Sequence, residues 1–130
     1  MNKLTVLVVD DEPDFLELIS LRISSWGYNA IKASCGQDAV TIVKENSPDI
    51  LVLDYMMPEM DGVTTLKEIR KLDKKLPVIM FTAYPNTKVI EDTNKLGIQA
   101  FIPKLSAYSE VVLTLKSTIE MLEKKLIKGA

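Results

Sequence analysis

The sequence has 130 residues, 47% of them hydrophobic, and its 16 basic and 18 acidic side chains give a formal net charge of -2. This length and composition predict a single domain with a full core, and the small negative charge argues against a nucleic-acid or membrane surface as the main partner. The single cysteine excludes an internal disulfide, the absence of histidine excludes histidine metal ligands and general bases, and no apolar run approaches the roughly 20 residues of a membrane span. A cytoplasmic protein without a signal peptide is therefore expected.

Strand-like and helix-like patterns alternate along the whole chain. Short apolar or β-branched runs predict strands, and apolar residues that recur at helical spacing predict helices. Pro13 suits the first turn of a helix, and Gly27 and Gly97 suit helix ends. In chain order, the predicted elements are a strand at Leu4–Val9, a helix at Pro13–Trp26, a strand at Tyr28–Ala33, a helix at Gly36–Asn46, a strand at Ile50–Asp54, a helix that follows Gly62 and reaches Lys71, a strand at Pro77–Thr82, a helix at Lys88–Leu96, a strand at Ala100–Pro103 and a helix at Tyr108–Ile127.

The run Ile50–Asp54 is the centre of this arrangement. Four apolar residues follow one another without a break and end on a carboxylate, which is typical of a strand buried on both faces of a parallel sheet. Each connecting helix is long enough to cross back over the sheet. We therefore expect an α/β fold with a doubly wound, five-stranded parallel sheet and helices on both faces.

The last two predicted helices differ in their apolar faces. The helix at Lys88–Leu96 has a thin face made of Val89, Ile90 and Leu96. The helix at Tyr108–Ile127 has a continuous inward seam made of Val112, Leu115, Ile119, Leu122 and Leu126, and three further apolar residues lie off that seam: Leu113, Met121 and Ile127.

Charged and polar side chains stand where four of the strands end. Asp10 and Asp11 follow the first strand, Asp54 ends the third, Thr82 ends the fourth and Lys104 follows the fifth. Parallel strands end at one edge of a sheet, where ligands bind in open α/β folds. At about 4 Å and an effective dielectric constant near 20, each pair of carboxylates repels by about 4 kcal/mol, which one lysine cannot offset for three of them. An all-oxygen site without His or Cys therefore predicts a hard dication, and Mg²⁺ suits a site with few protein ligands.

Each of these residues also has a plainer interpretation. Asp10 or Asp11 alone could cap a helix. Thr82 alone would be an ordinary strand residue, and Lys104 an ordinary surface lysine. Their joint placement at one sheet edge favours a functional site.

The chain resembles the response-regulator receiver domains of two-component signalling, of the CheY-like kind. The resemblance covers residues 1–130 as one receiver domain, and it implies the flavodoxin-like (βα)5 fold with strand order 2-1-3-4-5. It is carried by the acidic pair Asp10-Asp11, by Asp54 with Met57-Pro58 and Asp61-Gly62 after it, by Thr82-Ala83, and by Phe101 three residues before Lys104.

The resemblance implies a phosphoacceptor and a metal site. Asp54 would take a phosphoryl group from a phosphohistidine on a histidine kinase or a histidine phosphotransfer protein. Asp11, Asp54 and the backbone carbonyl of Met56 would bind Mg²⁺ directly, or Mn²⁺ in its place, and Asp10 would hold the ion through water. The chain would be a stoichiometric phosphoacceptor that assists its own phosphorylation and dephosphorylation, not an enzyme.

The resemblance also implies a switch. Lys104 and Thr82 would each contact a phosphoryl oxygen, and Phe101 would turn inward as Thr82 moves. Met56 and Tyr84 would flank the approach of the hydrolytic water, and neither carries a group suited to orienting it, so a long-lived phosphoryl group is expected.

The resemblance also implies a further partner, a downstream effector or output domain. This partner would contact the surface formed by residues 88–96, 100–103 and 108–127. The same surface could also form a phosphorylation-dependent homodimer. Direct nucleic-acid binding and membrane insertion by this domain are not expected.

One departure from the family pattern concerns the loop that carries Lys104. The family usually has proline directly after this lysine, often with a cis peptide bond, whereas here Leu105 follows and Pro103 precedes. A cis bond costs about 3–4 kcal/mol before leucine and only ~0.5–1 kcal/mol before proline.

Three alternatives remain at this point. A flavodoxin-like cofactor protein would need a Gly-, Ser- or Thr-rich loop for phosphate, where this chain has the repelling run Asp10-Asp11-Glu12. A receiver-fold interaction module that is never phosphorylated is the second. The third is a receiver excised from a longer regulator or hybrid kinase.

Overall fold

The computed structural model describes residues 3–57, 60–83, 87–104 and 107–128. Every predicted element is present, and each end lies within one residue of its predicted position. The elements are β1 (Thr5–Val9), α1 (Pro13–Ser25), β2 (Asn29–Ala33), α2 (Gly36–Asn46), β3 (Ile50–Asp54), α3 (Gly62–Leu72), β4 (Val78–Thr82), α4 (Thr87–Lys95), β5 (Ala100–Pro103) and α5 (Tyr108–Lys128).

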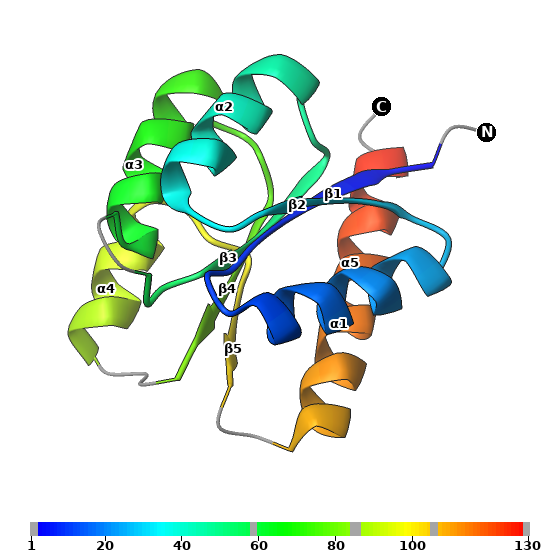
Figure 1. The fold of residues 1–130 in the computed structure, drawn as a ribbon. Helices are drawn as coiled ribbons and strands as arrows, with labels where there is room; N and C mark the ends of the chain where they lie inside the picture. The colour runs from blue at the N-terminus through cyan, green and yellow to red at the C-terminus, as the bar shows by residue number, and fades with distance from the viewer. Residues whose placement is uncertain (1–2, 58–59, 84–86, 105–106, 129–130) are drawn as a thin grey trace.

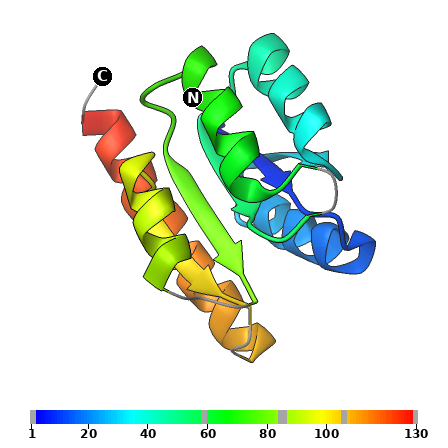
Figure 2. The same cartoon turned by 90° about the vertical axis from the view of Figure 1, so that its left-hand side faces the viewer.

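The strands form one parallel sheet in the order β2-β1-β3-β4-β5, which confirms the predicted fold class and strand order. Helices α1 and α5 cover one face, and α2, α3 and α4 cover the other (Figure 1). Figure 2 views the second face, where β4 is visible between α3 and α4. All residues of β3 and β4 are buried, as expected for the interior strands of a sheet covered on both sides.

Successive strand residues pack into two separate hydrophobic cores, because strand side chains alternate between the two faces of the sheet. Val6, Val8, Ile50, Val52 and Phe81 belong to the core beneath α1 and α5. The core beneath α2 and α3 receives the alternate strand residues Leu7, Val9, Leu51, Leu53, Val78 and Met80. This double burial fixes the strand register, because a slip of one residue would exchange the faces of every side chain.

Gly62 holds the connection after β3 close to the strand. A Cβ atom at this position would lie 2.7 Å from Tyr55 Cα and 2.8 Å from the Asp54 carbonyl oxygen, so only glycine fits. Its N–H donates to the Tyr55 carbonyl at 2.8 Å. Asp61 caps α3 by accepting from the Thr64 N–H at 2.8 Å. The backbone that follows Asp54 is therefore anchored at both of its described ends.

Helix α4 has the fewest buried residues of the helices in the described chain. Val89 and Thr93 are its buried residues, whereas Ile90, which belongs to the predicted apolar face, is 39% exposed. The Thr93 hydroxyl is satisfied by donating to the Val89 carbonyl at 2.8 Å, which allows a threonine to serve as an inward residue. In α5 the buried seam begins at Val111, one residue before the predicted Val112, which is half-buried.

Arg70 joins the end of α3 to the end of α4. Its guanidinium donates to four backbone carbonyls, those of Leu96 (2.7 Å), Leu76 (2.8 Å), Gly97 (2.9 Å) and Asp73 (3.2 Å). A planar fork of donors suits such a convergence of carbonyls, and lysine could not reproduce it.

Within the described parts of the chain, no helix combines the length and the apolar character needed to cross a membrane.

Candidate functional site at the carboxyl edge of the sheet

Asp10 is held at the end of β1 by backbone bonds. Its N–H donates to the Ala33 carbonyl at 3.1 Å, and its Oδ1 accepts from the Glu12 N–H at 2.9 Å. The Asp10 residue is only 1% exposed. This local turn places the Asp10 carboxylate inside the edge of the sheet and starts α1 directly after Glu12.

Asp54 ends the central strand and is 2% exposed. Its Oδ1 faces the Met56 N–H at 3.4 Å, and the Tyr55 N–H donates to the Phe81 carbonyl at 2.8 Å. Asp54 therefore ends the strand that lies between β1 and β4, and the backbone directly after it is bonded to β4.

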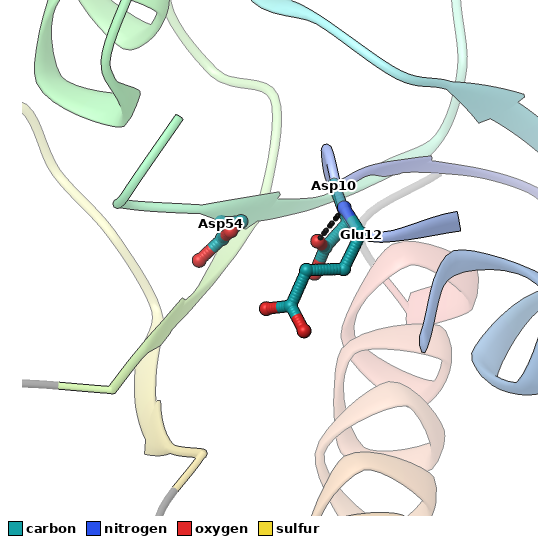
Figure 3. A group of neighbouring side chains, drawn as sticks. All are labelled: Asp10, Glu12 and Asp54. Atoms are coloured by element: carbon teal, nitrogen blue, oxygen red, sulfur yellow. Dashed lines mark hydrogen bonds between the residues drawn. The ribbon is translucent and has the colours of Figure 1, made fainter. Parts of the chain in front are cut away.

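Three carboxylates converge at this edge. Ligand oxygens of Asp10, Glu12 and Asp54 all lie within 4.8 Å of one another, and Figure 3 shows them at the ends of β1 and β3. Asp10 and Asp54 are buried, whereas the Glu12 side chain is 65% exposed. The group is thus closed on the side of the sheet and open to solvent on the side of Glu12.

Lys104 supplies the positive charge that this group requires. Its N–H donates to the Thr82 carbonyl at 2.7 Å, and its side chain, 9% exposed, reaches across β4. The Nζ atom lies 2.8 Å from Asp10 Oδ2, 3.0 Å from Glu12 Oε1 and 3.3 Å from Asp54 Oδ2. An ammonium has three donors, so one lysine is shared among three carboxylates.

One aromatic ring faces the ammonium, and a second ring packs against the first. Lys104 Nζ is 4.4 Å from the centroid of the Phe15 ring, which belongs to the first turn of α1. Phe15 in turn meets Phe81 edge to face, with ring centroids 5.6 Å apart and an interplanar angle of 89°. The ammonium therefore has carboxylates on one side and an aromatic face on another.

Burial and the neighbouring charges shift the pKa values of Asp10, Asp54 and Lys104. The pKa of Asp54 is raised to about 7, mainly by burial and further by the nearby Asp10 charge, while Lys104 acts to lower it. Burial likewise raises the pKa of Asp10, against the ion pair with Lys104. Burial acts to lower the pKa of Lys104, but its interactions with Asp10 and Asp54 outweigh that effect and raise it. The metal-free site thus holds more negative charge than its one lysine stabilises.

The other predicted site residues lie around this centre. Asp11 is half-buried and follows Asp10, but it is not one of the three residues whose oxygens converge. Thr82 is fully buried at the end of β4, and Phe101 is half-buried against the core beneath α2 and α3. Met56 is 50% exposed beside Asp54. Tyr84 and Leu105 lie outside the described residues, so the predictions that involve them stay predictions.

Sequence reasoning missed two residues of the site. Glu12 was noted only as part of an acidic run, although its spacing of two from Asp10 could have indicated a shared direction. Phe15 lies within the predicted helix at Pro13–Trp26 and packs against the core, but the sequence analysis did not predict its contact with Lys104. The signal for it was its position in the first helical turn after the acidic run.

The residues present fit a hard divalent cation. Oδ2 of Asp10 is buried, and Lys104 Nζ, 2.8 Å away, is its ion-pair partner. Three carboxylates against one ammonium leave an excess of negative charge, and every donor of the group is oxygen. Such a donor set suits Mg²⁺ or Mn²⁺ and not a soft metal.

This fold and this site define a receiver-type signalling domain. The response regulator receiver domain family matches residues 6–125, and the chain belongs to that family. The predicted resemblance is confirmed.

Curated relatives are longer proteins. The chain is 35% identical over 119 residues to the probable transcriptional regulatory protein TcrX of Mycobacterium tuberculosis, covering 88% of this chain and 49% of that protein. It is 32% identical over 118 residues to the transcriptional regulatory protein ZraR of Salmonella typhimurium, covering 91% of this chain and 27% of that protein. The chain thus spans only a part of the curated relatives it matches.

Solved structures show the same fold. A chain of the CheX–CheY–BeF3–Mg²⁺ complex from Borrelia burgdorferi is 33% identical, with a TM-score of 0.79 and 89% of each chain covered. The chemotaxis protein CheY4 of Vibrio cholerae has a TM-score of 0.82 at 23% identity, covering 90% of this chain and 99% of that chain.

Proposed function

We propose that this receiver domain accepts a phosphoryl group on Asp54 in a reaction that depends on Mg²⁺. The observation that carries the proposal is the placement of Asp54, a buried carboxylate at the end of the central strand, with Lys104 Nζ 3.3 Å away and Asp10 and Glu12 beside it. The similar chain from Borrelia burgdorferi was solved in a complex with BeF3 and Mg²⁺, which supports this proposal.

The chemistry of the step follows from these groups. A carboxylate oxygen of Asp54 forms a bond to phosphorus while the bond to the donor, an imidazole nitrogen or a small acyl phosphate, breaks. Asp54 must be ionised to act as the nucleophile, so the high pKa of the metal-free form opposes the reaction. Lys104 stabilises the charge on the phosphoryl oxygens because it is already held at this position.

The metal ion would be held directly by the carboxylates of Asp11 and Asp54 and by the carbonyl of Met56, and through water by Asp10. Glu12 would lie at the open side of the group. When bound it supplies positive charge that keeps Asp54 ionised and stabilises the transferring group. Because Asp11 lies outside the converging three, its side chain would have to turn toward the ion.

Asp54→Asn is expected to abolish phosphorylation. The variant keeps the shape of the side chain but removes the nucleophilic carboxylate. Intact-protein mass spectrometry after incubation with acetyl phosphate and Mg²⁺ should show a phosphoryl adduct on the wild type and none on the variant. Asp38→Asn is the matched control, since Asp38 is exposed on α2, and it should label like the wild type. Equal labelling of Asp54→Asn would reject the assignment.

Mg²⁺ is expected to stabilise the fold. A ligand that binds only the native state adds RT ln(1 + [L]/Kd), about 2.7 kcal/mol at a concentration of ~100 Kd. Thermal unfolding with increasing MgCl2 should therefore show a rising melting temperature, and Asp11→Ala should remove most of the rise while Asp38→Ala retains it. A melting temperature that ignores millimolar Mg²⁺ would contradict the metal site.

The partners follow from the same proposal. A histidine kinase or a histidine phosphotransfer protein would donate the phosphoryl group, and an effector or output domain would respond to it. The responding surface would comprise α4, β5 and α5, where Leu113, Met121 and Ile127 are exposed at 65%, 46% and 63%. A phosphorylation-dependent homodimer would use this surface.

A further inference from the structure

We propose that Phe15 is a positioning residue, whose ring face holds the Lys104 ammonium in place facing Asp54. This inference rests on the proposed phosphoacceptor function, because it concerns the lysine that assists the reaction at Asp54. It assigns a role to a core-facing aromatic residue of α1 that contacts the reaction centre only through another side chain.

The first observation is the contact itself. Lys104 Nζ is 4.4 Å from the centroid of the Phe15 ring, well inside the roughly 6 Å range at which a ring face attracts a cation. The Lys104 side chain is only 9% exposed, so water screens this attraction weakly. Desolvated contacts of this kind are the strong ones.

The second observation is that the ring is fixed in relation to Asp54. Phe15 packs edge to face on Phe81, which is 1% exposed and is the strand partner of Asp54 in the register of β3 and β4. The backbone of Phe81 also accepts the N–H of Tyr55. The Phe15 ring therefore packs on β4, the strand that pairs with β3 and with Asp54 at its end.

The third observation is the competition for the ammonium. Of its three carboxylate partners, Asp10 is the nearest at 2.8 Å and Asp54 the most distant at 3.3 Å. The carboxylates alone would draw the ammonium toward Asp10 and Glu12, away from the reacting group. The ring face attracts the cation without carrying a formal charge, so it restrains the ammonium without adding a further acidic competitor.

Leucine is the informative replacement, because it keeps an apolar side chain at this half-buried position but has no ring face. We expect Phe15→Leu to lower the initial rate of labelling by acetyl phosphate at saturating Mg²⁺ by about tenfold. Phe15→Tyr keeps the ring face and should label at close to the wild-type rate. Trp26→Leu is the matched control: Trp26 packs against the same core at the other end of α1, and its loss should leave the rate unchanged.

A second measurement does not depend on phosphorylation. The ε-methylene protons of Lys104 should show a ring-current shift in the NMR spectra of the wild type and of Phe15→Tyr, and this shift should disappear in Phe15→Leu. Melting temperatures measured in parallel report general loss of packing.

The outcomes separate the two claims. A wild type that takes no label rejects the proposed function. A labelled wild type with Phe15→Leu at the same rate overturns the role of Phe15 alone. Equal slowing of Phe15→Leu and Phe15→Tyr, or of Trp26→Leu, also overturns it, because packing would then explain the effect. Slowing confined to Phe15→Leu, with loss of the ring-current shift, supports it.

Discussion

Lys104→Met is expected to destabilise the metal-free protein by about 3–5 kcal/mol near neutral pH, the usual cost of removing one partner from a buried ion pair. Asp10 and Asp54, 1% and 2% exposed, would keep their burial and lose the ammonium that both contact. Urea unfolding monitored by circular dichroism should show a large shift of the midpoint with little change in slope.

The control for this substitution is a lysine at the surface. Lys32 pairs with Glu17 at 2.7 Å, but the two side chains are 48% and 53% exposed. Such pairs contribute about 0–1 kcal/mol, so Lys32→Met should be nearly neutral. If Lys104→Met costs no more than Lys32→Met, the three carboxylates do not depend on Lys104 for their stability. The loss caused by Lys104→Met should also shrink toward acidic pH, where Asp54 and Asp10 take up protons.

Asp54→Asn is expected to stabilise the metal-free protein at about pH 8 by about 2–4 kcal/mol, because each tenfold change in the proton affinity of a carboxylate corresponds to about 1.4 kcal/mol. The folded-state pKa of Asp54 is raised to about 7 from 3.8. The folded protein therefore binds a proton that the unfolded chain releases between these values. Stability consequently falls as pH rises through this window, and the penalty is complete above it. Asparagine carries no charge and avoids the penalty.

The pH dependence of this gain is the decisive measurement. Unfolding free energies of the wild type and of Asp54→Asn should differ most at about pH 8 and converge near pH 4, where the folded protein holds the proton and the unfolded chain begins to bind it. Asp38→Asn on the surface of α2 should show no such trend. A gain from Asp54→Asn that is equal at both pH values would mean that packing, and not charge, accounts for it.

The predictable part of this structure is the part encoded by periodicity. The unbroken run Ile50–Asp54 and the helices around it predict a parallel sheet. Because parallel strands end at one edge, Asp10, Asp54, Thr82 and Lys104 must lie at that edge, whatever their side-chain conformations. Strand side chains buried on both faces leave little freedom in register, which explains why the predicted ends of the elements agree so closely with the structure.

Side-chain direction at the edge was less predictable. Which residues of Asp10-Asp11-Glu12 turn toward Asp54 depends on a backbone turn that includes the bond from Asp10 N–H to the Ala33 carbonyl, a contact between distant parts of the sequence. Ile90 and Thr93 show the same limit, because a threonine that bonds its own helix can replace an apolar residue at a buried position. The Arg70 contacts also join segments that are distant in sequence.

The guanidinium of Arg70 ties the carboxyl-terminal end of α4 to α3. Bonds to the carbonyls of Leu96 and Gly97 tie that end to α3, whereas Val89 and Thr93 are the buried residues of the helix itself. A displacement of the whole helix would break both of these bonds, whereas a rotation about the tied end could keep them. A rotation of α4 about that end would therefore move Leu96 least and Thr87 most, and Thr87 lies on the side of the sheet edge that carries Asp54.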